Sequence, residues 1–138
     1  RVLDEFAHGR AQGNAQDESL VTHARKLSKA DGVINPAWPA EQIRRTVHGL
    51  TPWPGVGAIL DGAPMKLLRV QDLSSHPESG AAPVGALVDP KAGVVACGQG
   101  TALRLLEVQP LGKRAMRWDE YASGKRFSDS GRLEAAPC

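Results

Sequence analysis

The feature that most restricts the fold is the spacing of turn signals in the second half of the chain. Asp61-Gly62, Asp89-Pro90-Lys91-Ala92-Gly93 and Gly98-Gln99-Gly100 separate short apolar runs, and sequences of this kind favour tight hairpin turns. Connections this short join antiparallel neighbours. We therefore expect a largely antiparallel sheet whose strands lie at residues 56–60, 65–73, 84–88, 94–97 and 101–109.

The apolar residues of the last run indicate that the sheet closes on itself. Alternation along residues 101–109 places Leu103 and Leu105 on one face and Arg104, Leu106 and Val108 on the other. A sheet that is apolar on parts of both faces buries them best by curling into a barrel, with a helix over what remains. The expected fold is mainly β, a small five-stranded antiparallel barrel with one or two short helices.

Two segments are expected to form those helices. Residues 39–48 suit a helix because proline is favoured at the first helical position. Its buried stripe is expected to comprise Ile43, Val47 and Leu50. The prolines that follow predict a stiff corner at residues 51–55 with Trp53 as an aromatic anchor, and a second helix is expected over residues 115–123.

Length and composition suit one folded domain with extensions at both ends. A chain of 138 residues fits a single domain with a buried core. Residues 1–8 form a short amphipathic helix that needs something to pack on, and residues 9–19 have a linker composition. We expect residues 1–19 to hold the end of a missing upstream domain and a linker, residues 20–127 the barrel domain, and residues 128–138 a polar tail.

No pattern typical of a catalytic or metal site is found in the sequence. The four histidines are scattered, at His8, His23, His48 and His76, with no metal-ligand spacing to a cysteine or carboxylate. The Gly98-Gln99-Gly100 segment lacks the Lys-Ser/Thr ending of a phosphate-binding loop. Cys97 has no neighbouring base, so a buried strand residue is the better interpretation. We expect no catalytic residue and no metal ligand.

Basic residues are the strongest functional candidates, because of where they lie. The net charge is only +2, which gives no global argument for a nucleic-acid partner. Residues 111–127 nevertheless hold five cations against two carboxylates. A closed barrel would bring these and the strand cations to one surface, whereas the alternative is an ordinary solvated face. The candidate RNA-binding residues are Lys66, Arg69, Arg104, Lys113, Arg114, Arg117, Lys125 and Arg126.

Several short motifs occur in an order and at a spacing that resemble a known family. The main ones are residues 50–55 (LTPWPG), 95–105 (VACGQGTALRL) and 109–116 (QPLGKRAM). Shorter ones are residues 24–29 (ARKLSK), 40–43 (AEQI) and 131–133 (GRL). Together they resemble the C-terminal domain of the methionyl-tRNA formyltransferase family over nearly the whole chain.

The resemblance implies a five-stranded barrel of the OB type with an added helix, which docks initiator methionyl-tRNA through phosphate contacts. It also implies a preceding catalytic domain, missing here, that transfers a formyl group from 10-formyltetrahydrofolate to the methionine on that tRNA. No position here matches the catalytic residues, so this chain alone is expected to be inactive and to hold no cofactor. Lys26 and Lys29 match linker lysines of the family, which adds both to the candidate RNA contacts.

The resemblance leaves a second function open. Related formyltransferases that act on a nucleotide sugar or on folate carry a similar domain, which would serve packing or oligomer contacts there. The basic residues between positions 113 and 126 favour the tRNA partner over this alternative.

The expected location is the cytoplasm. The chain has only two cysteines, Cys97 and Cys138, which is too few to predict a disulfide framework. No apolar run approaches the roughly 18 residues of a membrane span, and no signal peptide opens the chain. No membrane partner is therefore expected.

Overall fold

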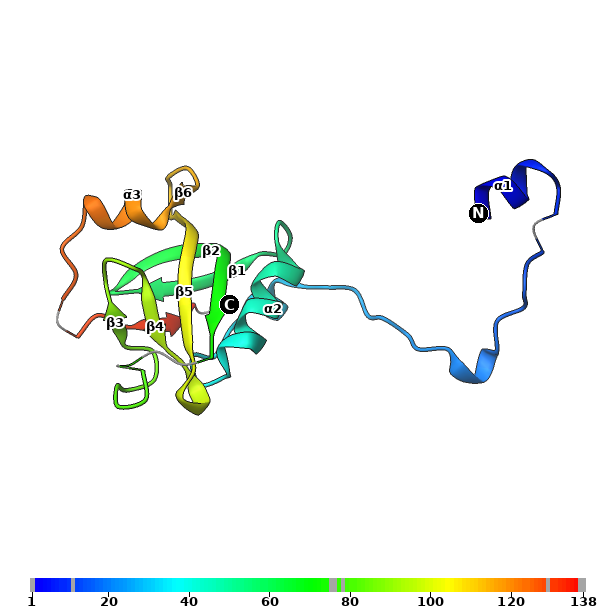
Figure 1. The fold of residues 1–138 in the computed structure, drawn as a ribbon. Helices are drawn as coiled ribbons and strands as arrows, with labels where there is room; N and C mark the ends of the chain where they lie inside the picture. Colours follow the sequence, from blue (N-terminus) through cyan, green and yellow to red (C-terminus); the bar gives the residue numbers. More distant parts are fainter. Residues whose placement is uncertain (1, 11, 75–76, 78, 129, 137–138) are drawn as a thin grey trace.

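Short antiparallel strands form most of the folded part of the chain in this computed structural model (Figure 1), which describes residues 2–10, 12–74, 77, 79–128 and 130–136. The strands are β1 (Val56–Leu60), β2 (Ala63–Leu73), β3 (Leu87–Asp89), β4 (Val94–Ala96), β5 (Ala102–Pro110), β6 (Met116–Arg117) and β7 (Leu133–Ala135). The helices are α1 (Val2–Ala7), α2 (Ala40–Leu50) and α3 (Trp118–Ser123), and the 3₁₀ turns are η1 (Glu18–Leu20), η2 (Lys29–Gly32) and η3 (Gly98–Gly100). The expectation of a mainly antiparallel β-fold is confirmed.

The strands form one sheet in the order β3-β4-β5-β2-β1-β7, with β6 paired to β5. This sheet is strongly curled into a half-barrel (Figure 1). An isolated antiparallel bridge between Ala86 and Arg132 links the segments next to its two outer strands. Two backbone hydrogen bonds flank the bridge. The amide of Leu133 donates to the carbonyl of Gly85 at 2.7 Å, and the amide of Leu87 donates to the carbonyl of Gly131 at 2.9 Å.

The three predicted turns are confirmed, and the one at residues 89–93 connects β3 to β4, which pair antiparallel. Asp61 and Gly62 connect β1 to β2 with φ angles of +50° and +75°, the left-handed pair that a two-residue hairpin turn with the right twist requires. The Gly98–Gly100 turn connects β4 to β5, which pair antiparallel. All three turns join strands whose apolar runs the sequence also predicted.

Two register shifts in the β2–β5 pair change which side chains face the core. Leu67 lies opposite Val108, Arg69 opposite Glu107 and Val70 opposite Leu105, so Leu68 and Leu106 each lack a partner in the ladder. Each extra residue reverses the alternation of the strand that carries it. Val108 is therefore fully buried with the core, and the prediction that it shares a face with Arg104 is wrong.

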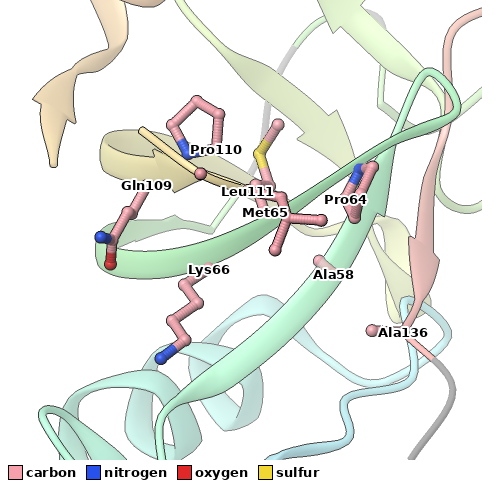
Figure 2. Close-up of a pocket in the computed structure, with 9 residues that line it drawn as sticks. Ala58, Pro64, Met65, Lys66, Gln109, Pro110, Leu111 and Ala136 are labelled. Atoms are coloured by element: carbon pink, nitrogen blue, oxygen red, sulfur yellow. The ribbon is translucent and has the colours of Figure 1, made fainter. Parts of the chain in front are cut away.

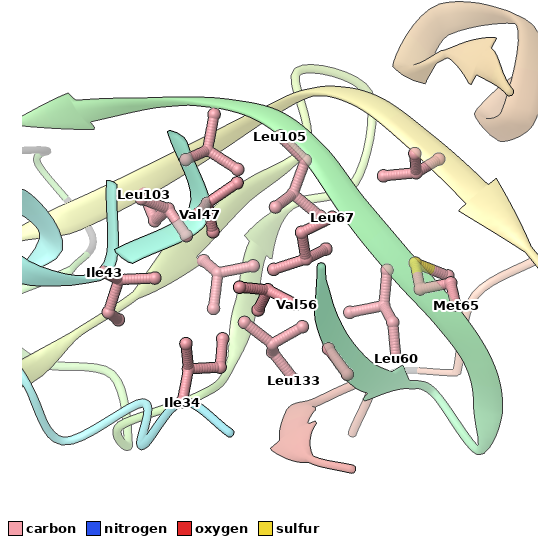
Figure 3. Close-up of a cluster of buried hydrophobic side chains, with 14 of the residues drawn as sticks. Ile34, Ile43, Val47, Val56, Leu60, Met65, Leu67, Leu103, Leu105 and Leu133 are labelled. Carbon is pink, nitrogen blue, oxygen red and sulfur yellow. The ribbon is translucent and has the colours of Figure 1, made fainter. Parts of the chain in front are cut away.

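Helix α2 covers one side of the curled sheet and completes its core. Pro39 stands at the N-cap, where its missing N–H costs nothing. Ile43 and Val47 are fully buried and lie among side chains of the strands (Figure 3). Leu50 packs against the same cluster from its edge. The predicted stripe of this helix is confirmed, and burial of such a stripe is the main stabilisation of a short helix.

The C-terminal third differs from the sequence-based expectation in two ways. Residues 116–117, expected to be helical, form strand β6, and the helix α3 begins only at Trp118. Residues 133–135, expected in a polar tail, form β7, which pairs with β1. Both strands are so short that only their pairing partners stabilise them, and no local sequence pattern marks them.

The aromatic residue that packs in the core is Trp118. Its ring stacks on Phe127 with 5.6 Å between centroids, and its Nε1–H donates to the carbonyl of Pro90 at 3.0 Å. Trp53, expected as the anchor of the proline-rich corner, is 62% exposed instead. The expectation for Trp53 is wrong.

The segment before the barrel is extended and exposed. Helix α1 leaves Val2, Leu3 and Phe6 exposed, and residues 12–28 run along an open path (Figure 1). None of the helices in the described part of the chain is long and apolar enough to cross a membrane.

Candidate nucleic-acid interface

Three adjoining hollows form a shallow groove on the surface, which we call the lysine groove. The central hollow lies between β2 and the turn after β5 (Figure 2) and shares Lys66 and Ala136 with the hollow at one end. It shares Pro64, Pro110 and Leu111 with the hollow at the other end. The lysines that line the groove are Lys29, Lys66, Lys113 and Lys125.

Lys29 is positioned by the first turn of η2. The Ser28 amide donates to Oδ2 of Asp31 at 2.7 Å, and Arg25 forms an ion pair with the same carboxylate. These contacts hold the pKa of the Asp31 carboxyl well below its usual range, with the hydrogen bond from Arg25 as the largest cause. The turn that carries Lys29 is therefore stabilised by a carboxylate that stays ionised.

Lys66 lies on the outward side of β2, directly opposite Gln109 on β5. Its aliphatic stem passes over the proline-rich corner, since a Cβ at Gly55 would lie 3.9 Å from Cδ of Lys66. Burying the stem against backbone leaves the ammonium group free to face solvent.

Lys113 and Lys125 stand at the far end of the groove. The amide of Lys113 donates to the carbonyl of Pro110 at 3.0 Å, and its own carbonyl accepts a hydrogen bond from Nε2 of Gln109 at 3.1 Å. Nζ of Lys125 donates to the Tyr121 hydroxyl at 3.0 Å and lies 5.4 Å from the centre of that ring. The backbone of Lys113 and the ammonium group of Lys125 are thus tied to ordered parts of the fold.

Each of the three hollows of the lysine groove is lined by at least one lysine. No acidic side chain lines any of its three hollows in the described part of the chain. None of its four lysines takes part in the ion pairs found among the described residues. Lys125 does interact electrostatically with the nearby Asp61 carboxylate. Cations along adjoining hollows attract a polyanion, and the counterions that the polyanion releases on binding make that attraction dependent on salt.

A second basic hollow lies beside α3. Arg104 and Arg117 line it together with Lys91, a residue that the sequence analysis did not select. Asp119 also lines this hollow and accepts a hydrogen bond from Nε of Arg117 at 3.2 Å. Its cations are therefore partly neutralised, unlike those of the lysine groove.

The remaining candidates lie outside both hollows. Arg69 stands opposite Glu107, which in turn stands opposite Arg117, so the carboxylate lies between two cations. Arg114 forms an ion pair with Glu120. Of the ten basic residues proposed from the sequence, the structure brings four together in the lysine groove and two in the second hollow. The four outside both are Lys26, Arg69, Arg114 and Arg126.

Two of the residues considered for catalysis, Cys97 and His48, make structural contacts, and His76 lies outside the described residues. Cys97 is buried, and this burial raises the pKa of its thiol to about 12, so the reactive thiolate is scarce at neutral pH. Nε2 of His48 accepts the Val70 amide at 3.3 Å, next to the register shift in β2. No group of three or more metal-ligating side chains occurs among the described residues.

Comparison with known proteins identifies the family. A family model described as "Formyl transferase, C-terminal domain" matches residues 26–126. The chain belongs to this family. Two curated relatives are named methionyl-tRNA formyltransferase: one from Herpetosiphon aurantiacus is 39% identical over 127 residues, or 91% of this chain and 40% of the relative. One from a Roseiflexus species is 34% identical over 133 residues, or 96% of this chain and 40% of the relative.

The chain spans about two fifths of the length of these two relatives. All four lysines of the groove fall within the residues that match the formyl transferase C-terminal domain, whereas β7 lies beyond them. The lysine groove is thus built within the family's own domain.

Proposed function

We propose that this chain is the tRNA-docking C-terminal domain of a methionyl-tRNA formyltransferase. The observation that carries the proposal is the lysine groove: four lysines from separate segments line three adjoining hollows, and no acidic side chain lines these hollows in the described part of the chain. A surface of this kind suits the phosphates of folded RNA, since contacts to phosphate position RNA without reading its sequence. Membership of the formyl transferase C-terminal domain family and the names of the two relatives support the choice of tRNA.

The proposal extends to the complete enzyme. A catalytic domain preceding this one would transfer the formyl group from 10-formyltetrahydrofolate to the methionine of initiator methionyl-tRNA in the cytoplasm. We assign no catalytic or cofactor-holding residue to the present chain, which would be inactive alone.

We further propose that the curled sheet is a closed barrel of the OB type. The bridge between Ala86 and Arg132 supports this, because it connects the two outer ends of the strand order. OB barrels commonly present one strand face and its loops to nucleic acid, and β2, which carries Lys66, borders the groove. We propose the other candidates as secondary contacts: Lys26, Arg69, Arg104, Arg114, Arg117 and Arg126.

The salt dependence of tRNA binding tests the proposed function. If the four groove lysines each neutralise one phosphate, log affinity falls with log salt with a slope of about −3 to −4. Lys113→Ala is expected to weaken binding to all tRNAs alike and to reduce the steepness by about 1. Arg45→Ala is the control, since Arg45 lies on α2, pairs with Glu41 and lines neither the lysine groove nor the second hollow, and its slope is expected to equal that of the parent chain. Fluorescence anisotropy of labelled tRNA measures all three.

The opposite result is equally specific. A flat titration with tRNA at low salt, together with self-association at micromolar concentration, would replace RNA docking with an oligomer-contact function. Equal slopes for the parent chain and Lys113→Ala would remove the groove from the docking surface.

A further inference from the structure

The central hollow of the lysine groove has a property that phosphate contacts do not require. Its floor and walls are mainly apolar, formed by Pro64, Met65, Pro110 and Leu111 (Figure 2), and it encloses about 210 Å³. Pockets for drug-sized ligands run to roughly 300–1,000 Å³, so this hollow suits a single ring system. Leu111 is 79% exposed at its rim.

The rim of this hollow is held in place by backbone and side-chain hydrogen bonds. The Leu111 amide donates to the carbonyl of Pro64 at 3.1 Å, which fixes the turn after β5 to the start of β2. The Gln109 side chain closes the same turn by donating from Nε2 to the carbonyl of Lys113. That bond uses the amide nitrogen and leaves Oε1 of Gln109 as an acceptor at the hollow.

Cations flank this apolar hollow on both sides. Lys66 lies at one side, and Lys113 and Lys125 line the hollow that adjoins the other side. A nucleotide within an RNA strand has a matching arrangement of groups: a phosphate on each side and the apolar face of a base between them. A fully paired helix keeps its bases inside the stack and presents only backbone, whereas unpaired nucleotides expose a base that proteins can bind.

We propose that the central hollow binds the base of one unpaired nucleotide of the docked RNA, with Leu111 and Pro110 against its face and Oε1 of Gln109 accepting a hydrogen bond from its edge. This inference rests on the proposed function, because the lysines on both sides must first hold the RNA. It adds a preference for RNA with an unpaired nucleotide, which lysine contacts alone do not provide.

Two RNA duplexes with the same base pairs test the inference in binding to the chain of residues 1–138. One duplex is fully paired and blunt-ended, and the other has one additional, unpaired nucleotide in the middle of one strand. We expect the second to bind roughly fivefold to tenfold more tightly, the lower end of the range for one stacked base. Leu111→Ser is expected to abolish this preference without changing the salt slope, since no charge is removed.

Two control variants separate the base contact from a general change in the surface. Leu111→Met keeps an apolar side chain and is expected to keep the preference. Val84→Ser removes another exposed apolar side chain, in the segment before β3 and outside the groove. This variant is expected to bind each of the two duplexes with the affinity of the parent chain.

Several results would overturn the inference. Equal binding of the two duplexes would remove the nucleotide pocket and leave the proposed function standing. A preference that survives Leu111→Ser would place the unpaired nucleotide elsewhere on the protein. Absence of binding to either duplex and to whole tRNA would overturn the proposed function and this inference together.

Discussion

A single backbone contact decides how the loop before α2 meets the hairpin turn of β4 and β5. The amide of Gly98 donates to the carbonyls of Pro36 and Trp38, both at 3.1 Å. A Cβ at Gly98 would lie 1.8 Å from the carbonyl oxygen of Ala37, far inside contact distance. Only glycine allows the backbone at position 98 to approach the backbone of residues 36–38 this closely. Gly98 therefore connects the sheet to the segment that leads into α2.

We expect Gly98→Ala to lower the free energy of unfolding by about 3 kcal/mol or more, because one of two backbones must move. Gly124→Ala is the control, since Gly124 has a negative φ and no atom within 4 Å of a Cβ placed there. That variant is expected to stay within about 0.5 kcal/mol of the parent chain. Urea denaturation followed by circular dichroism measures both, and equal losses would show that the close approach relaxes without cost.

At the scale of the elements, the last short strand contributes more to the fold than its length suggests. β7 pairs with β1, placing Leu133 opposite Leu60, and both side chains are buried in the core. The same strand begins beside the bridge that links the two outer ends of the sheet. Residues 133–135 are thus part of the folded sheet.

We expect Leu133→Ala to lower the free energy of unfolding by about 2–5 kcal/mol, the usual cost of a cavity in a core. Glu134→Ala is the matched control on the same strand, since Glu134 is exposed, and a change within about 0.5 kcal/mol is expected. Denaturation midpoints measure the two variants. If Leu133→Ala unfolds at the same midpoint as Glu134→Ala, then β7 does not contribute to the core.

The sequence predicted the elements that carry a strong local signal. The five strands, their hairpin turns and the stripe of α2 follow from apolar periodicity and turn residues. The short strands β6 and β7 were missed because only non-local pairing stabilises them. The burial of Val108 was missed because the extra residues Leu68 and Leu106 shift the register of the β2–β5 pair. The residue types in a strand do not reveal where such an extra residue lies.

At the scale of the whole molecule, the lysine groove depends on how the curled sheet brings distant segments together. Lys29 comes from the segment before α2, Lys66 from β2, and Lys113 and Lys125 from either side of α3. The sequence predicted that cations from separate segments share a surface, but it did not predict which of the ten candidate residues would lie together. Lys91 was missed as a neighbour of Arg104 because their proximity arises from the β4–β5 pairing and the turn before it.

Lysine footprinting tests the central claim, that RNA lies along the groove, most directly. The chain is acetylated with an amine-reactive ester, free or bound to tRNA, and the modification of each lysine is quantified by mass spectrometry. We expect the reactivity of Lys29, Lys66, Lys113 and Lys125 to fall roughly threefold or more in the complex, since a phosphate contact covers the amine. Lys91 lies beside the secondary contacts Arg104 and Arg117, and its reactivity is expected to fall less. Groove lysines that react as in the free chain, or a Lys91 protected as strongly as they are, would contradict the account.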